Sequence, residues 1–193
     1  MVATRNTRQD VVRAAGRLFA DRGYHGTSMR ELGKELGLLG SSLYSHVSSK
    51  QDLLVEVVAE GARLFEQSAD EAIATDGSAA DRLDALIAGH VDVVIDNIEV
   101  ARTFLNEARM LDADHRSQII AARDHYEATF RSVIREGMGD GSFGAGTDPK
   151  TASIFILSIL NAIERWYRPD GELSRVGLVA RLSRFARSAL ADA

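Results

Sequence analysis

Apolar residues recur at intervals of three and four positions along most of this chain, and only two prolines interrupt its 193 residues. This spacing puts apolar side chains on one face of an α-helix, whereas strict alternation would indicate a strand. The β-branched residues are scattered and do not alternate. Because prolines are so few, long helices are permitted. The sequence therefore predicts an all-α fold.

Several of these helical patterns begin or end at recognisable signals. Ser28 stands three residues before Glu31, which is the spacing of a capping box at a helix N-terminus. Gly37 follows the next short apolar stripe, where a helix end favours the left-handed backbone that glycine adopts easily. Asp148 before Pro149 matches an N-cap followed by proline at the first helical position. We expect helices at about residues 7–21, 29–36, 39–47, 50–74, 82–96, 99–112, 115–136, 149–167 and 173–190.

Basic residues are concentrated in the first 50 residues of an otherwise acidic chain. The whole chain has a formal net charge of −5. The first 50 residues hold eight lysines and arginines against four acidic residues, a net charge of +4, and the remainder holds 15 against 24, a net charge of −9. Such asymmetry indicates a small basic module, residues 1–50, joined to an acidic body, residues 51–193.

The composition excludes several classes of protein. The chain has no cysteine, so it can form neither disulfides nor thiolate metal sites. Its apolar runs are too short to span a bilayer, and the stretch MVATRNTRQD lacks the apolar segment of a secretion signal. We therefore expect a cytoplasmic protein with no membrane partner.

Two short helical patterns separated by Gly37 follow the first longer one, which is the arrangement of a helix-turn-helix. Leu39, Leu43 and Val47 would face the core from the second short helix, and the residues between them would point outward. In such motifs this helix enters the major groove of DNA, where serine hydroxyls can reach base edges. Short helical hairpins also occur in all-α proteins that do not bind DNA, and composition alone does not separate the two cases.

A resemblance to a known family favours DNA binding. The residues that carry it are Arg17-Leu18-Phe19, Gly23-Tyr24, Gly26-Thr27-Ser28, Arg30-Glu31-Leu32, Gly37, Leu43-Tyr44, His46-Val47, Ser49-Lys50 and Leu53-Leu54. In these residues and their spacing, the segment from about 7 to 54 is similar to the N-terminal domain of TetR-type transcriptional repressors. The resemblance implies a homodimer. Each chain would have an N-terminal helix-turn-helix domain of three helices and a C-terminal helical bundle that binds a small effector and forms the dimer.

The same resemblance implies which residues contact DNA. Tyr44, His46 and Lys50 match positions that contact the DNA backbone, and the second short helix supplies the recognition positions. Leu39 and Val47 depart from the usual capping hydroxyl and the usual phenylalanine, so no operator sequence is predicted. The full set expected on an operator of double-stranded DNA is Thr27, Ser28, Arg30, Gly40, Ser41, Ser42, Tyr44, Ser45, His46 and Lys50.

Three segments of the C-terminal part resemble TetR-type regulators of lipid or aromatic-acid degradation that respond to acyl-CoA thioesters. They are RTFLNEARMLD, HYEATFRSVIREGMGDGSF and NAIERWYRPDGELS. The resemblance implies an apolar pocket for the acyl chain, with arginines at its mouth that pair with phosphates. The last two expected helices match the four-helix bundle of the family's dimer interface. The candidate effector-binding residues are Arg102, Phe104, Asn106, Arg109, Arg123, Phe155, Arg165 and Trp166.

The chain contains no recognisable catalytic constellation, and we expect it to be no enzyme and to hold neither a cofactor nor a metal. Residues 139–144 read GDGSFG, but the dinucleotide-binding glycine motif needs a preceding strand, whereas a helix is expected here. Two alternatives to an acyl-CoA-responsive repressor stay open. One is a helical ligand-sensing protein that acts through a protein partner. The other is a TetR-type regulator of drug efflux with a cationic or hydrophobic effector.

Overall fold

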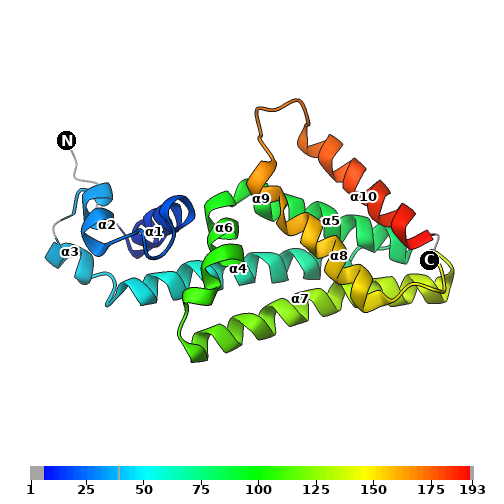
Figure 1. Cartoon of the computed structure of the whole chain (residues 1–193), viewed down its shortest axis with the longest axis horizontal. Coiled ribbons are helices and arrows are strands. Elements are labelled where there is room, and N and C mark those ends of the chain that lie inside the picture. Colours follow the sequence, from blue (N-terminus) through cyan, green and yellow to red (C-terminus); the bar gives the residue numbers. More distant parts are fainter. Residues whose placement is uncertain (1–6, 39, 192–193) are drawn as a thin grey trace. The chain divides into compact units, whose positions relative to one another are not determined.

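The structure is a computed structural model of the chain and describes residues 7–38 and 40–191, with side chains omitted from the description at 40 and 41. Figure 1 shows helices throughout, and these residues contain no β-strand. The predicted all-α fold is therefore confirmed. The helices are α1 (Arg8–Arg22), α2 (Met29–Leu36), α3 (Gly40–Tyr44), α4 (Lys50–Ile73), α5 (Ala79–Asp96), α6 (Ile98–Glu107), α7 (Ala113–Asp140), α8 (Pro149–Asn161), α9 (Ile163–Trp166) and α10 (Arg175–Ala191), with a 3₁₀-helix, η1, at Ala108–Met110.

The chain divides into two compact units, and each unit draws on two separate stretches of sequence. The N-terminal unit comprises residues 1–62 and 99–120, and the C-terminal unit comprises residues 63–98 and 121–193. Helices α4 and α7 each contribute residues to both units. The N-terminal unit therefore contains nearly all of α6 and the whole of η1 besides the helices of the expected helix-turn-helix.

The core of the N-terminal unit consists of side chains from its short helices and from the first half of α4. Val11 and Phe19 of α1, Leu32 of α2, Leu43 of α3 and Leu53 of α4 are all fully buried. Burial of one such side chain stabilises a fold by about 1.5–3 kcal/mol. The short helices α2 and α3 are too short to be stable by themselves, so this shared core holds them in place.

Local signals define the helix ends as the sequence analysis predicted. The hydroxyl of Ser28 accepts a hydrogen bond of 3.2 Å from the main-chain N–H of Glu31, and the Glu31 carboxylate accepts one from the Ser28 N–H. Gly37 ends α2 in the left-handed conformation, with φ of +64°. The Asp148 side chain accepts a hydrogen bond of 3.1 Å from the N–H of Thr151 at the start of α8. These predictions are confirmed.

In the C-terminal unit, α10 packs along α5 (Figure 1). Arg175 near the start of α10 pairs with Asp92 at 3.1 Å and also with Asp96. Arg187 near its end pairs with Asp84 at 2.6 Å. The ion pairs are solvent-exposed, so each contributes little stability and mainly fixes the position of α10. The buried apolar side chains of the unit are Leu83, Leu86, Ile87, Val91, Val94, Phe130, Val133, Ile134, Ile156, Leu160, Ile163, Leu178 and Leu190.

Two expected helices are interrupted in the structure. The helix expected at 149–167 breaks at Ala162, whose N–H bonds back to the carbonyl of Ile159 in a tighter, 3₁₀-type turn. The helix expected at 99–112 ends at Glu107 and gives way to η1, in which the Leu111 N–H bonds back to the Ala108 carbonyl at 3.2 Å, and Asp112 then caps α7. The Asp112 side chain accepts a hydrogen bond of 3.0 Å from the N–H of His115, and a residue in that capping role cannot also continue the preceding helix.

Candidate nucleic-acid interface and effector region

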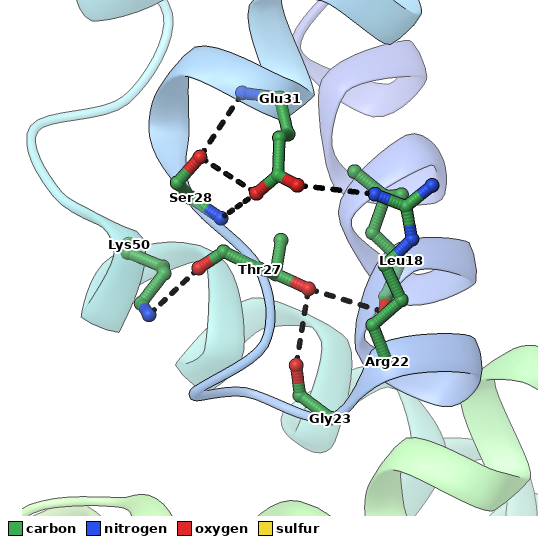
Figure 2. A network of polar contacts seen from close by, with 7 residues as sticks. All are labelled: Leu18, Arg22, Gly23, Thr27, Ser28, Glu31 and Lys50. Carbon is green, nitrogen blue, oxygen red and sulfur yellow. Dashed lines mark hydrogen bonds and ion pairs between the residues drawn. The ribbon is translucent and has the colours of Figure 1, made fainter.

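The start of α2 combines an exposed hydroxyl with a fixed carboxylate (Figure 2). The Ser28 hydroxyl is 2.7 Å from a Glu31 carboxylate oxygen, and the other carboxylate oxygen accepts a hydrogen bond of 3.2 Å from Arg22. These hydrogen bonds from Ser28, with the nearby positive charge of Arg22, lower the pKa of Glu31. Arg30, the next residue of α2 after Met29, is exposed. Ser28 and Arg30 therefore lie on an accessible surface at the first turn of α2.

Thr27 and Lys50 lie close together, and both are engaged within the protein (Figure 2). Thr27 is buried, and its single hydroxyl proton is shared between the carbonyls of Leu18 at 3.2 Å and Gly23 at 3.0 Å. The Lys50 ammonium donates to the carbonyls of Tyr24 at 2.9 Å and Thr27 at 2.8 Å. It also lies 4.1 Å from the centroid of the Tyr24 ring, within range of a cation–π interaction. These contacts fasten the turn between α1 and α2 to the start of α4.

The short helix α3 has one buried and one exposed face. Leu43 and the following Val47 are buried, as predicted, whereas Tyr44 is 56% exposed and Ser45 is exposed. The Ser45 hydroxyl donates a hydrogen bond of 2.7 Å to the carbonyl of Ser42, which is half-buried. The expected core residue Leu39 lies outside the described residues, and for Gly40 and Ser41 the structure describes the backbone of α3 alone.

The residue that follows Ser45 is fixed by a contact that sequence reasoning missed. His46 is half-buried, and its carbonyl accepts a hydrogen bond of 2.7 Å from the guanidinium of Arg8. Arg8 also forms an ion pair with Glu56 of α4. Arg8 therefore joins the start of α1 to α4 and to the segment after α3. No local pattern could reveal this role, because the partners of Arg8 are 38 and 48 residues away.

A second missed group of contacts joins the helix-turn-helix to α6 and η1 within the N-terminal unit. The Tyr24 N–H donates a hydrogen bond of 3.0 Å to the Glu107 carboxylate at the end of α6. The Tyr24 hydroxyl donates to the side-chain oxygen of Gln51 at 2.8 Å, and the Gln51 amide reaches the carbonyl of Met110 in η1 at 3.4 Å. Tyr24, in the turn before α2, thus bonds directly to Gln51 of α4 and to Glu107 of α6. Gln51 extends this connection to η1.

A glycine makes this junction possible. Gly23, which precedes Tyr24, has φ of +71°, a conformation that side-chain-bearing residues rarely adopt. Gly61 of α4 allows close packing of Phe104, because a Cβ there would lie 2.6 Å from the Phe104 Cβ. Gly61 therefore allows α6 to pack closely against α4, whereas Gly23 is needed for its backbone conformation.

The candidate effector residues are divided between the two units. Four of them lie on α6 and η1 in the N-terminal unit. Phe104 is buried against Gly61, Arg102 is half-buried, and Asn106 donates a hydrogen bond of 3.0 Å to the Arg102 carbonyl, whereas Arg109 is exposed.

The other four candidates belong to the C-terminal unit. Arg123 of α7 is half-buried, and burial lowers its pKa. Arg165 is exposed and pairs with Glu164 at 3.2 Å, and Trp166 is also exposed. Phe155 of α8 is 64% exposed and lines an apolar groove of about 570 Å³ between α8 and α10. The role of these eight residues in effector binding stays a prediction.

The described residues contain neither a metal-binding cluster nor a membrane-spanning helix. In residues 7–38 and 40–191, no group of three histidine or acidic residues is arranged to hold a metal ion. Across the same residues, no helix has both the length and the apolar character needed to cross a membrane. The glycine-rich segment after α7 forms a turn in which Gly141 has φ of +82°, and the Phe143 N–H bonds back to the Gly137 carbonyl at 2.9 Å.

Comparison with known proteins reveals relatives along most of the chain. The "HTH-type transcriptional repressor KstR2" of Mycolicibacterium smegmatis is 26% identical over 168 residues, which cover 86% of this chain and 82% of that protein. The solved structure of PfmR, a TetR family transcriptional regulator from Thermus thermophilus, matches with a TM-score of 0.84 at 27% identity, over 92% of this chain and 97% of that one.

A second similar structure was solved with ligands. It is AibR in complex with isovaleryl coenzyme A and operator DNA, with a TM-score of 0.82 at 24% identity over 95% of this chain and 97% of that one. At this level of identity the likeness establishes the fold.

Family descriptions match both parts of the chain. Residues 11–57 match "Bacterial regulatory proteins, tetR family", and residues 76–190 match "Tetracyclin repressor-like, C-terminal domain". The first match covers the helix-turn-helix with its exposed Tyr44, and the second covers α5 to α10. With both matches in the expected order along one helical chain, this protein belongs to the tetR family of bacterial regulatory proteins.

Proposed function

We propose that this transcriptional regulator represses its target genes by binding a near-palindromic operator as a homodimer, and that an acyl-CoA thioester releases it. The observation that carries the DNA-binding part is the geometry of α3. Buried Leu43 and the Val47 that follows α3 anchor this helix, while Tyr44 at its end and Ser45 just after it are exposed. A short helix held in this way can enter the major groove without rearranging the core behind it.

The proposed DNA-binding surface consists of direct contacts and of residues that position them. Tyr44, Ser45 and the residues at 40–42 would meet the major groove, and Ser28 and Arg30 would meet phosphates beside it. Phosphate contacts set the register of such a complex, whereas base contacts give its specificity. In the described conformation the side chains of Thr27 and Lys50 are used internally, so we assign them a positioning role.

The proposed dimer interface is the apolar surface of α8 and α10. Phe155 and Phe185 are 64% and 57% exposed and line the same groove, and Ile154 beside Phe155 is also exposed. Large apolar side chains exposed together indicate a surface that another protein covers. A second copy would cover it symmetrically, and the resulting dimer would present two α3 helices to half-sites about one helical turn apart.

The acyl-CoA part rests on the sequence resemblance and on the relatives described above. AibR binds isovaleryl coenzyme A, and arginines suited to phosphate groups lie on α6 to α9 of this chain, among them Arg102, Arg123 and Arg165. An effector that contacts α6 could alter the junction of Tyr24 with Glu107 and so misplace α3. The shift in DNA affinity can be no larger than the effector's differential affinity for the two conformations. The protein would act by binding alone, without turnover.

The test is a fluorescence anisotropy titration with labelled DNA from upstream of the protein's own gene. We expect saturable binding of two chains per operator, an affinity that falls with salt at a log–log slope of about −0.9 per neutralised phosphate, and release by acyl-CoA thioesters. Mass spectrometry of small molecules that co-purify with the protein identifies the effector directly. The absence of sequence-specific DNA binding would contradict the repressor proposal, and release by a cationic drug alone would contradict the acyl-CoA part.

A further inference from the structure

The basic residues of the helix-turn-helix differ in whether the protein already uses their charge. Residues 7–38 and 40–50 contain seven lysines and arginines. Two of them, Arg30 and Lys34 of α2, are exposed and form no ion pair with any residue that the structure describes. The other five are engaged within the protein, and they are Arg8, Arg13, Arg17, Arg22 and Lys50.

The two unpaired cations lie on the side of α2 that is next to α3. A helix turns by about 100° per residue, so Arg30 and Lys34 lie about 60° and 100° from Gly33 around the helix axis, in the same direction. Gly33 is buried and faces α3, because a Cβ added to it would lie 3.9 Å from the Leu43 side chain. Arg30 and Lys34 therefore flank the face of α2 that packs against α3.

The acidic residues of α2 lie on its other side. Glu31 and Glu35 are each about 160° from Gly33 around the helix axis, in opposite directions. Glu31 accepts a hydrogen bond of 3.2 Å from Arg22 of α1 (Figure 2). Glu35 pairs with Arg17 of α1 at 3.9 Å. Helix α2 therefore directs its carboxylates towards α1 and its two unpaired cations towards the α3 side.

This arrangement suits a bound polyanion. Two like charges four residues apart on a helix repel each other, and a phosphate beside them would relieve that repulsion. The two residues are about 6 Å apart along the axis of α2. Phosphates of one DNA strand follow each other about every 3.4 Å along the duplex axis, so two long side chains at this spacing can each reach a phosphate.

We propose that Lys34, together with Arg30, forms a two-cation strip on α2 that binds phosphates of the strand beside the groove entered by α3. The arginines of α1 contribute little to DNA binding, because their charges are already paired within the protein. The inference rests on the proposed operator binding and adds Lys34, which is absent from the expected DNA-binding set. In a helix-turn-helix the first of the two short helices crosses the DNA backbone, where such a strip would lie.

The experiment measures binding of the full-length protein to two labelled duplexes by fluorescence anisotropy at several salt concentrations. One duplex is DNA from upstream of the protein's own gene, and the other has the same length and a random sequence. We expect Lys34→Gln to weaken the log–log salt slope by about 0.9 for each bound chain on both duplexes, because phosphate contacts carry no sequence information. The double variant with Arg30→Gln should lose about 1.8. Lys34→Arg should keep the wild-type slope.

Arg13→Gln is the matched control. It removes one positive charge from the same unit, but Arg13 lies on α1 and pairs with Asp10 at 3.6 Å. We expect it to keep the wild-type slope. Because Arg13 and Lys34 are both exposed, both glutamine variants should also keep the wild-type thermal midpoint. That measurement separates a lost DNA contact from a folding defect.

The outcomes for the inference and for the proposed function differ. A wild-type slope in Lys34→Gln would contradict the inference about Lys34. An equal loss of slope in Arg13→Gln would also contradict it, since the effect would then follow the overall charge. If the wild type binds both duplexes equally tightly, the repressor proposal is wrong, while the slope on the random duplex still decides whether Lys34 contacts phosphates. If the wild type binds neither duplex, both are wrong.

Discussion

The main-chain N–H of Tyr24 donates a hydrogen bond of 3.0 Å to the carboxylate of Glu107, across 83 residues of sequence. The bond joins the turn before α2 to the end of α6. Other groups of Tyr24 are also engaged, since its carbonyl accepts from Lys50 and its hydroxyl donates to Gln51. A movement at the end of α6 would therefore strain or break the bond between Tyr24 and Glu107. Replacing Glu107 tests whether the proposed effector response passes through this bond.

Replacing Glu107 should separate DNA binding from effector response. We expect Glu107→Ala to lose about 1–2 kcal/mol of unfolding free energy, because loss of the carboxylate leaves a partly buried main-chain donor unpaired. We expect operator affinity without effector to change little, and release by effector to weaken. Anisotropy titrations with and without effector measure both. Glu107→Gln keeps an oxygen acceptor and serves as the control. Normal release in Glu107→Ala would show that the response does not pass through this bond.

Tyr44 should contribute to operator affinity and not to the stability of the fold. Its side chain is 56% exposed beside the buried Leu43, so Tyr44→Ala removes little buried surface. We expect operator affinity to fall by about tenfold or more, a loss of about 1.4 kcal/mol, with an unchanged thermal midpoint. Tyr24→Phe is the contrasting tyrosine variant, because its hydroxyl is bonded to Gln51 and its loss should lower stability instead. Wild-type operator affinity in Tyr44→Ala would remove Tyr44 from the proposed interface.

Lys50 and Arg30 should behave differently although both are basic residues of the expected DNA-binding set. Lys50→Ala leaves the carbonyls of Tyr24 and Thr27 without their donor, so we expect a loss of about 2 kcal/mol in urea unfolding. Arg30→Ala removes an exposed charge, so stability should hold while the salt dependence of operator binding weakens by about 0.9 in log–log slope. An unchanged unfolding midpoint in Lys50→Ala together with weak DNA binding would mean that Lys50 contacts DNA directly.

The groove between α8 and α10 should control dimerisation. We expect Phe155→Glu and Phe185→Glu to give monomers in sedimentation velocity, because each places a charge on an apolar surface that the partner would cover. Operator binding should fall as a consequence. Ile73→Glu alters an exposed apolar side chain at the end of α4 and should stay dimeric. If both phenylalanine variants remain dimers, the interface lies elsewhere.

His90 should make stability depend on pH. Its folded pKa of about 3 lies below the ordinary value of 6.5, so the unfolded chain takes up a proton first as the pH falls. The stabilising effect is fully present above pH 6.5 and is lost as the pH drops towards 3. We expect the unfolding free energy to fall by up to about 1.4 kcal/mol per pH unit in this range. Urea unfolding at about pH 7, 6 and 5 tests this. His90→Asn should flatten the slope, whereas replacing the exposed His125 in the same way should not.

Much of the local structure could be predicted because its causes lie within a few residues. The capping box of Ser28 with Glu31, the left-handed Gly37 and the N-cap at Asp148 all depend on neighbours in sequence, and each was recognisable. The breaks at Ala162 and before Asp112 were missed, since the apolar spacing continues through both positions. The amphipathic pattern of α3 likewise predicted that Leu43 and Val47 are buried.

By itself, then, the sequence determined the all-α fold, the helix-turn-helix and which face of α3 is exposed, because apolar spacing and capping act over one or two helical turns. Only the tertiary structure decided three sets of hydrogen bonds. Lys50 donates to two carbonyls, the Tyr24 N–H donates to Glu107, and the His90 ring bonds to the Tyr126 hydroxyl. Those partners lie between 23 and 83 residues apart. A hydrogen bond over such a distance depends on how helices pack, and packing is set by the whole core rather than by any local pattern.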